Sequence, residues 1–232
     1  MSAVLNSATN AENGILALVR ERGSLRDTAP MVEFLDRCLG ATDLRRQVKE
    51  SLPALLADIS HFMAISHGRH PGVVDHAADR MVDQSARGWV VAATQGFAAE
   101  RNLLNQMIVA AGPIQRHSDQ DKVTALLASQ ARSFELLATS ERKGCAAGAA
   151  IAFVLDWQAT RPLLERTALA LGIQPAVETL PQAAASQELL EILSESPATE
   201  RAIFFGAEEI VAQQSGLWRL VAARHAVFSA MG

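Results

Sequence analysis

Apolar residues recur three and four positions apart along almost the whole chain. This spacing places them on one face of an α-helix, and the alanine, leucine, glutamate, arginine and glutamine residues between them favour helices. No segment shows the alternation of β-branched or aromatic residues with polar ones that indicates a strand. The pattern therefore predicts an all-α fold with helices at 10–22, 30–39, 43–66, 72–111, 119–140, 142–171, 184–194 and 199–230.

The three longest predicted helices span 72–111, 142–171 and 199–230. The apolar stripe of the first continues for about ten turns, so we expect a kink near Gly88 or Gly96. The second begins with a stripe of small residues that includes Gly144 and Gly148. Small side chains let two helix backbones approach closely, which predicts a tightly packed partner helix.

The length of the chain fits one large domain, and a hydrophobic content of 49% is sufficient for a substantial core. The best linker candidate is the stretch QPAVETLPQ at 174–182, which contains two prolines but is too short to require a domain boundary. We therefore expect residues 1–232 to form a single domain of about seven to nine helices.

Charge and composition narrow the classes of partner. The net charge is −4, and no block of lysine and arginine is present to neutralise a run of phosphates, so we expect no nucleic-acid partner. The N-terminus lacks the pattern of a secretion signal. The longest strongly apolar run, 144–155, is shorter than the roughly 20 residues that cross a bilayer. We therefore expect a soluble cytoplasmic protein in which Cys38 and Cys145 are thiols.

The stretch HFMAISHGRHPGVVDHAADR at 61–80 holds four of the six histidines and suggests a metal site. Imidazoles and carboxylates are good ligands for zinc, iron or manganese. His67 and His70 are expected in a loop, while His76 and Asp79 are three positions apart on the following helix and share a face. The four residues form a candidate metal site.

The same stretch also fits a polar turn between two helices. Gly68 and Pro71 suit a connection, and the helical wheel turns His76 and Asp79 away from the apolar stripe, toward solvent. Neither an HExxH motif nor a CxxC motif is present. On this interpretation His67 and His70, beside Arg69, form a corner that suits an anion or a partner protein.

A second candidate site consists of polar residues at positions where the helical pattern predicts a buried side chain. Glu100, Asp156 and His225 are such residues, and Trp89 is a candidate aromatic wall. A buried polar group without a partner is costly, so these side chains either pair or line a small-molecule pocket. If Glu100 pairs, Arg132 or Arg161 is its expected partner.

Long helices, short connections and this chain length resemble the heme oxygenase and TenA-like class of helical domains. The resemblance implies helices that enclose a ligand pocket. Neither activity is carried over, because no histidine precedes His61 and the chain has no tyrosine. The stretches GRHPGVVDHA and GCAAGAAIA also look similar to an uncharacterised all-helical family of alphaproteobacteria, which implies no function.

The sequence favours a helical protein that binds a small ligand or serves as a protein-interaction scaffold. Apolar and small-residue helix faces also predict a homodimer or other homo-oligomer. The alternative is an enzyme, with its site either in the bundle interior or at the histidine and aspartate cluster. The pattern identifies no cofactor and no catalytic residue.

Overall fold

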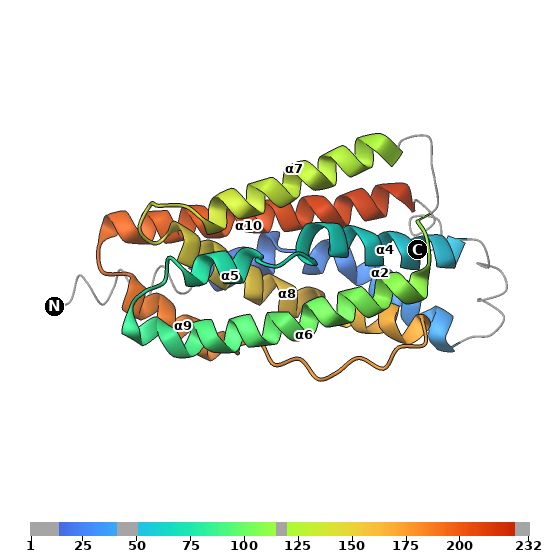
Figure 1. Cartoon of the computed structure of the whole chain (residues 1–232), viewed down its shortest axis with the longest axis horizontal. Coiled ribbons are helices and arrows are strands. Elements are labelled where there is room, and N and C mark those ends of the chain that lie inside the picture. Colours follow the sequence, from blue (N-terminus) through green and yellow to red (C-terminus); the bar gives the residue numbers. More distant parts are fainter. Residues whose placement is uncertain (1–13, 41–50, 115–119, 226–232) are drawn as a thin grey trace.

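The computed structural model describes residues 14–40, 51–114 and 120–225. Every regular element in these ranges is a helix, as the sequence pattern predicts, and the long helices run along one axis (Figure 1). The chain is helical at 14–22, and the helices that follow are α2 (Leu25–Gly40), α4 (Ser51–His67), α5 (Val73–Ala78), the 3₁₀ turn η1 (Gln84–Ala86), α6 (Arg87–Ala111), α7 (Gln120–Ala138), α8 (Cys145–Ala170), α9 (Ala183–Leu193) and α10 (Pro197–Arg224). The predicted helical residues at 10–13, 43–50, 119 and 226–230 lie outside the described residues.

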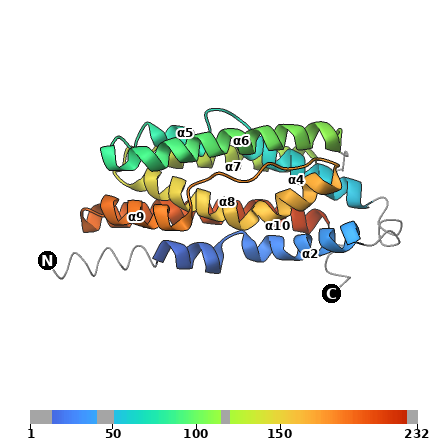
Figure 2. The ribbon, with the colours of Figure 1, turned by 90° about the horizontal axis from the view of Figure 1, so that it is seen from below.

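Helix α8 lies in the middle of the bundle, with α2 on one side and α6 on the other (Figure 2). Of its 26 residues, 19 are buried, so α8 presents apolar side chains in every direction. A helix that is apolar all round requires neighbours on all sides. Helix α8 therefore forms the core around which the other helices pack.

Helices α8 and α10 approach so closely that glycine is required at their contact. A Cβ atom added at Gly148 would lie 1.9 Å from the carbonyl oxygen of Ile203, and one added at Gly206 would lie 2.1 Å from that of Cys145. Gly144 precedes α8 with a φ of 96°, which favours glycine. The prediction that the small-residue stripe packs tightly against another helix is confirmed.

The single helix predicted at 72–111 is wrong, because the chain leaves the helix after α5 and returns to it at η1. Asp83 causes the new start, since its Oδ1 accepts a hydrogen bond of 2.8 Å from the Ser85 amide. Val82, which the pattern places on the buried stripe, is 85% exposed. Helix α6 then continues through both Gly88 and Gly96.

The segment at 174–182, the predicted linker, is non-helical and packs along α6 and α8 (Figure 1). The Arg161 guanidinium donates to the Ala176 carbonyl at 2.8 Å, and the Gln158 amide donates to the Pro181 carbonyl at 3.2 Å. Leu180 is buried against Gly96, where an added Cβ would lie 2.9 Å from the leucine side chain. The segment is thus part of the packed structure.

Among the described residues, no helix has both the length and the apolar character needed to cross a bilayer.

Candidate ligand-binding site

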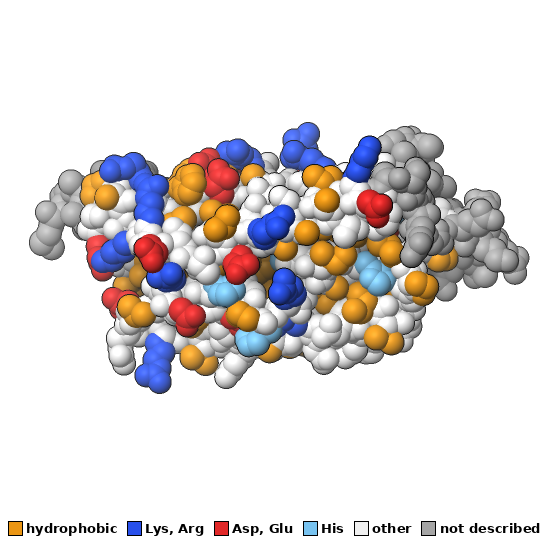
Figure 3. All heavy atoms as spheres, turned by 45° about the horizontal axis from the view of Figure 1, so that its top comes forward, with side chains coloured by type: hydrophobic (Ala, Val, Ile, Leu, Met, Phe, Trp, Pro, Cys, Tyr) orange, Lys and Arg blue, Asp and Glu red, His pale blue; other side chains and the backbone are white. Residues whose placement is uncertain are grey.

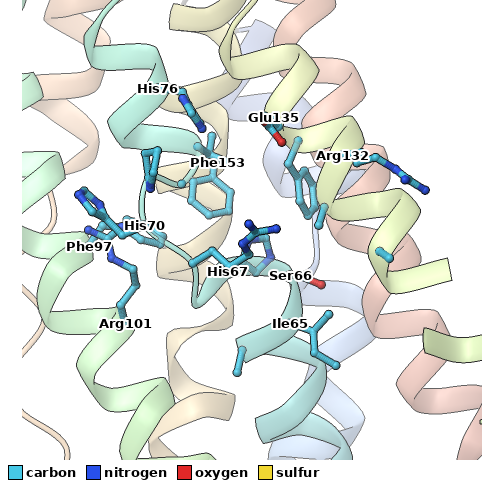
Figure 4. A pocket seen from close by; sticks show the side chains of 18 residues that line it. Ile65, Ser66, His67, His70, His76, Phe97, Arg101, Arg132, Glu135 and Phe153 are labelled. Atoms are coloured by element: carbon cyan, nitrogen blue, oxygen red, sulfur yellow. The ribbon is translucent and has the colours of Figure 1, made fainter. Parts of the chain in front are cut away.

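A pocket of about 610 Å³ lies between the end of α4, the following loop, α5, α6, α7 and α8 (Figure 4). We call it the His67 pocket. It is lined chiefly by the buried residues His67, Phe97, Phe134 and Phe153 and, nearer the surface, by Arg69, His70, His76, Arg101, Arg132 and Glu135. Its volume is within the range of about 300–1,000 Å³ that is typical of small-molecule sites.

The buried side of the His67 pocket is aromatic. The His67 ring centroid lies 4.9 Å from that of Phe134 and 5.1 Å from that of Phe153, and Phe97 lies 4.8 Å from Phe153. The Trp157 ring packs edge-on against the His67 ring, with 5.5 Å between the two ring centroids. These rings come from α4, α6, α7 and α8. They form a floor against which an apolar or aromatic molecule can pack.

His67 is the last residue of α4 and is only 5% exposed, so the prediction that it lies in a loop is wrong. Its Nε2 donates to Oε1 of Gln214 on α10 at 2.8 Å. This arrangement leaves Nδ1 as an acceptor. Burial lowers the pKa of the imidazole to about 3, so the ring is neutral near pH 7.

Two side chains that line the His67 pocket each have a buried polar atom with no partner within the part of the chain that the structure describes. These atoms are His67 Nδ1 and Ser66 Oγ, and neither makes a hydrogen bond. Leaving a buried polar group unpaired costs about 1–3 kcal/mol. A ligand group or water that bonds to these atoms would recover this free energy.

One arginine in the wall is fixed by a carboxylate. Arg101 on α6 donates to Asp75 on α5 at 2.8 Å, and both side chains are 11% exposed. Asp75 also accepts a hydrogen bond from the Gly72 amide at 2.8 Å and lies 3.2 Å from His70 Nδ1. The loop before α5 is therefore tied to α6, which holds this side of the His67 pocket in place.

The remaining charges at the surface end are less constrained. No hydrogen bond or ion pair joins the Arg69 or Arg132 side chain to another described residue. On the face shown in Figure 3, histidine side chains lie beside basic side chains near the middle of the molecule. Figure 4 shows His76 directed toward Phe153, whereas Arg132 extends away from the cavity over α7.

The proposed metal ligands are only partly brought together. His67, His70 and His76 all line the His67 pocket, but Asp79 does not. His70 pairs with Asp75, and its side chain is 70% exposed. Among the described residues, no group of three histidine, cysteine, aspartate or glutamate side chains is placed to hold a metal ion.

Glu100, from the second candidate set, is paired in the core. Its carboxylate accepts hydrogen bonds from Trp157 Nε1 at 3.0 Å and from Arg161 Nε at 3.1 Å. Arg161 also donates to Glu165 at 3.0 Å. Of the two arginines named as partners from the sequence, Arg161 is the one that makes the contact.

The other three residues of the second candidate site make hydrogen bonds in three different parts of the fold. Asp156 accepts hydrogen bonds from Ser24 N at 2.7 Å and Ser24 Oγ at 2.5 Å, and burial raises the pKa of its carboxyl to about 6. His225 Nε2 lies 2.8 Å from Asp58, and Trp89 Nε1 donates to Ser186 at 2.9 Å. No hydrogen bond joins two of the four candidates Glu100, Asp156, His225 and Trp89, and none of them lines the His67 pocket.

The sequence pattern does not identify the α7 side of the pocket as part of a site, and Arg132 of this helix was named only as a possible partner of Glu100. Phe134 and Glu135 lie on this helix, and Ala131 completes the wall one turn earlier. Phe134 belongs to the buried stripe of α7, together with Val123, Leu127 and Gln130. That stripe was a usable signal for burial, but it contains no information about which residues face a cavity.

Comparison of the chain with protein families gives a match over much of its length. The family described as "Family of unknown function (DUF6975)" matches residues 36–228, which is most of the chain. Comparisons with curated proteins and with solved structures gave no match. The match covers all the residues of the His67 pocket.

Proposed function

We propose that this chain, which belongs to the family of unknown function DUF6975, binds a small organic molecule in the His67 pocket. The observation that supports this proposal most strongly is the buried His67 imidazole, which lines the pocket and has one nitrogen without a partner among the described residues. A purely structural histidine would be expected to have both nitrogens satisfied. A ligand with a hydroxyl or N–H group would supply the missing donor.

The shape and composition of the pocket support the same proposal. Its aromatic floor provides contacts for an apolar body, and aromatic pairs contribute about 0.5–1.5 kcal/mol beyond area burial. The neutral state of His67 keeps Nδ1 available as an acceptor near pH 7. An apolar cavity with a few convergent polar groups is the usual form of a small-molecule site.

Binding of the neutral fluorescent probe N-phenyl-1-naphthylamine tests the proposal. Ala131 lines the pocket from α7, so Ala131→Trp should place an indole ring in it and obstruct binding, whereas Ala125 is exposed on the same helix and does not line it. We expect saturable binding of one probe molecule to the wild type and to Ala125→Trp, and loss of binding in Ala131→Trp. Equal binding to all three proteins would contradict a site in this pocket.

In the part of the chain that the structure describes, no contact favours the other functions that the sequence predicts. Self-association, a scaffold role and an enzymatic role remain predictions from the sequence, as does a cytoplasmic location. The pairing of Glu100 with Arg161 supports a structural role for this carboxylate rather than a catalytic one.

A further inference from the structure

We infer that the ligand of the His67 pocket is a small organic acid whose single carboxylate lies at the surface end of the pocket, near Arg69. This inference rests on the proposed function and adds the chemical class of the ligand. It follows from three observations: the sign of the charges in the wall, which of them are unpaired, and where they lie relative to the aromatic floor.

The wall is basic although the protein is acidic. Arg69, Arg101 and Arg132 line the pocket together with a single acidic residue, Glu135. The whole chain has a net charge of −4, so the positive charge of the pocket wall is opposite in sign to the net charge of the protein. A cavity with walls of one charge sign raises the local concentration of ligands of the opposite sign.

The three arginines are not equivalent. Arg101 already has Asp75 as its ion-pair partner. Arg69 and Arg132 have no such partner in the described part of the chain, and both are exposed. Arg132 points away from the cavity in Figure 4, but exposed side chains change rotamer within nanoseconds, so it can turn toward a bound anion. These two guanidinium groups are the available anion contacts.

The balance of unpaired charge indicates a single negative group. Arg69 and Arg132 contribute two positive charges and Glu135 one negative charge, which leaves a surplus of one. A carboxylate matches this surplus, whereas a phosphate monoester carries about −1.5 to −2 near pH 7. Arginine also binds carboxylates well because its planar guanidinium can donate two parallel hydrogen bonds.

The positions of the two kinds of wall residue determine the orientation of the ligand. The aromatic rings and His67 are buried, and Arg69 and Arg132 are at the exposed end. The acid would therefore enter with its apolar body first and keep its carboxylate near the surface. A donor group at the far end of the body would approach His67 Nδ1.

The test is displacement of N-phenyl-1-naphthylamine by a series of compounds with one body and different head groups. Hydroxyphenylpropionate, hydroxyphenylpropanol and tyramine share a phenol ring and carry a carboxylate, a hydroxyl and an ammonium group. We expect the acid to displace the probe at concentrations about tenfold lower than the alcohol, and tyramine to be weakest. Displacement by the alcohol or the amine as readily as by the acid would overturn the inference.

Matched variants show whether Arg69 and Arg132 cause the preference for the acid over the alcohol. In Arg69→Gln/Arg132→Gln the acid should lose its roughly tenfold advantage over the alcohol, when each displacement is corrected for the affinity of that variant for the neutral probe. The control is Arg80→Gln/Lys122→Gln, which removes two exposed positive charges outside the pocket and should keep the advantage. An unchanged advantage in the pocket variant, an equal loss in the control, or loss of neutral-probe binding in the pocket variant would each overturn the inference.

The two proposals fail in different ways. If the neutral probe does not bind, or if it binds Ala131→Trp as well as the wild type, the proposed function is wrong. If the probe binds in the pocket but head-group charge has no effect, only the inference about the acid is wrong.

Discussion

His67 and Gln214 are 147 residues apart in the sequence, yet His67 Nε2 lies 2.8 Å from Gln214 Oε1 in the core. This contact joins the end of α4 to α10 and fixes the orientation of the imidazole ring. The ring in turn lines a pocket, and its Nδ1 has no partner in the described ranges of the chain. The histidine therefore links the packing of the bundle to its candidate site.

A double-mutant cycle tests this contact. His67→Phe or Gln214→Leu alone should destabilise the protein by about 1–3 kcal/mol, because each removes one partner and leaves a polar group of the other buried. The double variant should cost at least about 1 kcal/mol less than the sum of the two single variants. Urea unfolding of the four proteins gives these values. Additive costs would show that the two side chains do not interact.

The free energy of unfolding should change with pH because the Asp156 carboxyl has a raised pKa. Burial raises the pKa of its carboxyl to about 6 from a usual value of 3.8, so between these pH values the folded state binds a proton that the unfolded chain releases. The stability from this group is fully present below about pH 4 and is lost as the pH rises through about 6.

Asp156→Asn should remove that dependence, because the amide imitates the protonated acid and can bond to both Ser24 N and Ser24 Oγ. The unfolding free energy of the wild type, relative to that of the variant, should fall by up to about 3 kcal/mol between pH 4 and pH 7. Denaturant unfolding at several pH values measures this change. A constant difference across the range would contradict the raised pKa.

Two glycine substitutions should have opposite effects. Gly148→Ala places a Cβ atom 1.9 Å from the Ile203 carbonyl, so we expect a loss of several kcal/mol or no folded protein. Gly216 is exposed in α10 with no atom within 4 Å of an added Cβ. Gly216→Ala should stabilise the protein by about 0.5–1 kcal/mol, because alanine has the higher helix propensity. Melting temperatures of both variants provide the comparison, and a harmless Gly148→Ala would contradict the close helix contact.

His70→Ala should change the unfolding free energy by no more than about 0.5 kcal/mol. The His70 side chain is 70% exposed, and its contact with Asp75 is duplicated by the partly buried pair between Asp75 and Arg101. Chemical denaturation measures the effect, with Arg101→Ala as the contrasting variant that leaves Asp75 without its main partner. A cost for His70→Ala as large as that for Arg101→Ala would show that the histidine has a larger structural role.

The helical class of the fold was predictable because apolar residues three and four positions apart lie on the same side of an α-helix. The break between α5 and α6 was missed because the apolar stripe of the sequence continues through Met81 and Val82. The usable signal was the Asp83–Ser85 pair, a short capping pattern at the start of η1. Local capping chemistry therefore determined the helix boundary where the hydrophobic pattern alone did not.

The candidate site was only partly predictable. The sequence drew attention to the histidine stretch and to a polar, cationic corner at His67, Arg69 and His70, and all three residues do line the pocket. Burial of His67 could not be inferred, because it depends on Gln214 and on the rings of α7 and α8, which are distant in sequence. Glu100 and Asp156 were recognised as inward-facing, but their partners became evident only from the fold.

The most direct test of the central claim is the NMR spectrum of the His67 imidazole during titration with hydroxyphenylpropionate, with His67→Phe used to assign its resonances. If the acid lies in the His67 pocket, these resonances should shift and should saturate at the concentration that displaces the neutral probe. The same titration of Ala131→Trp should leave them unchanged, because the indole obstructs the pocket. Unchanged His67 resonances in the wild type, while the probe is displaced, would place the binding site elsewhere and contradict the account.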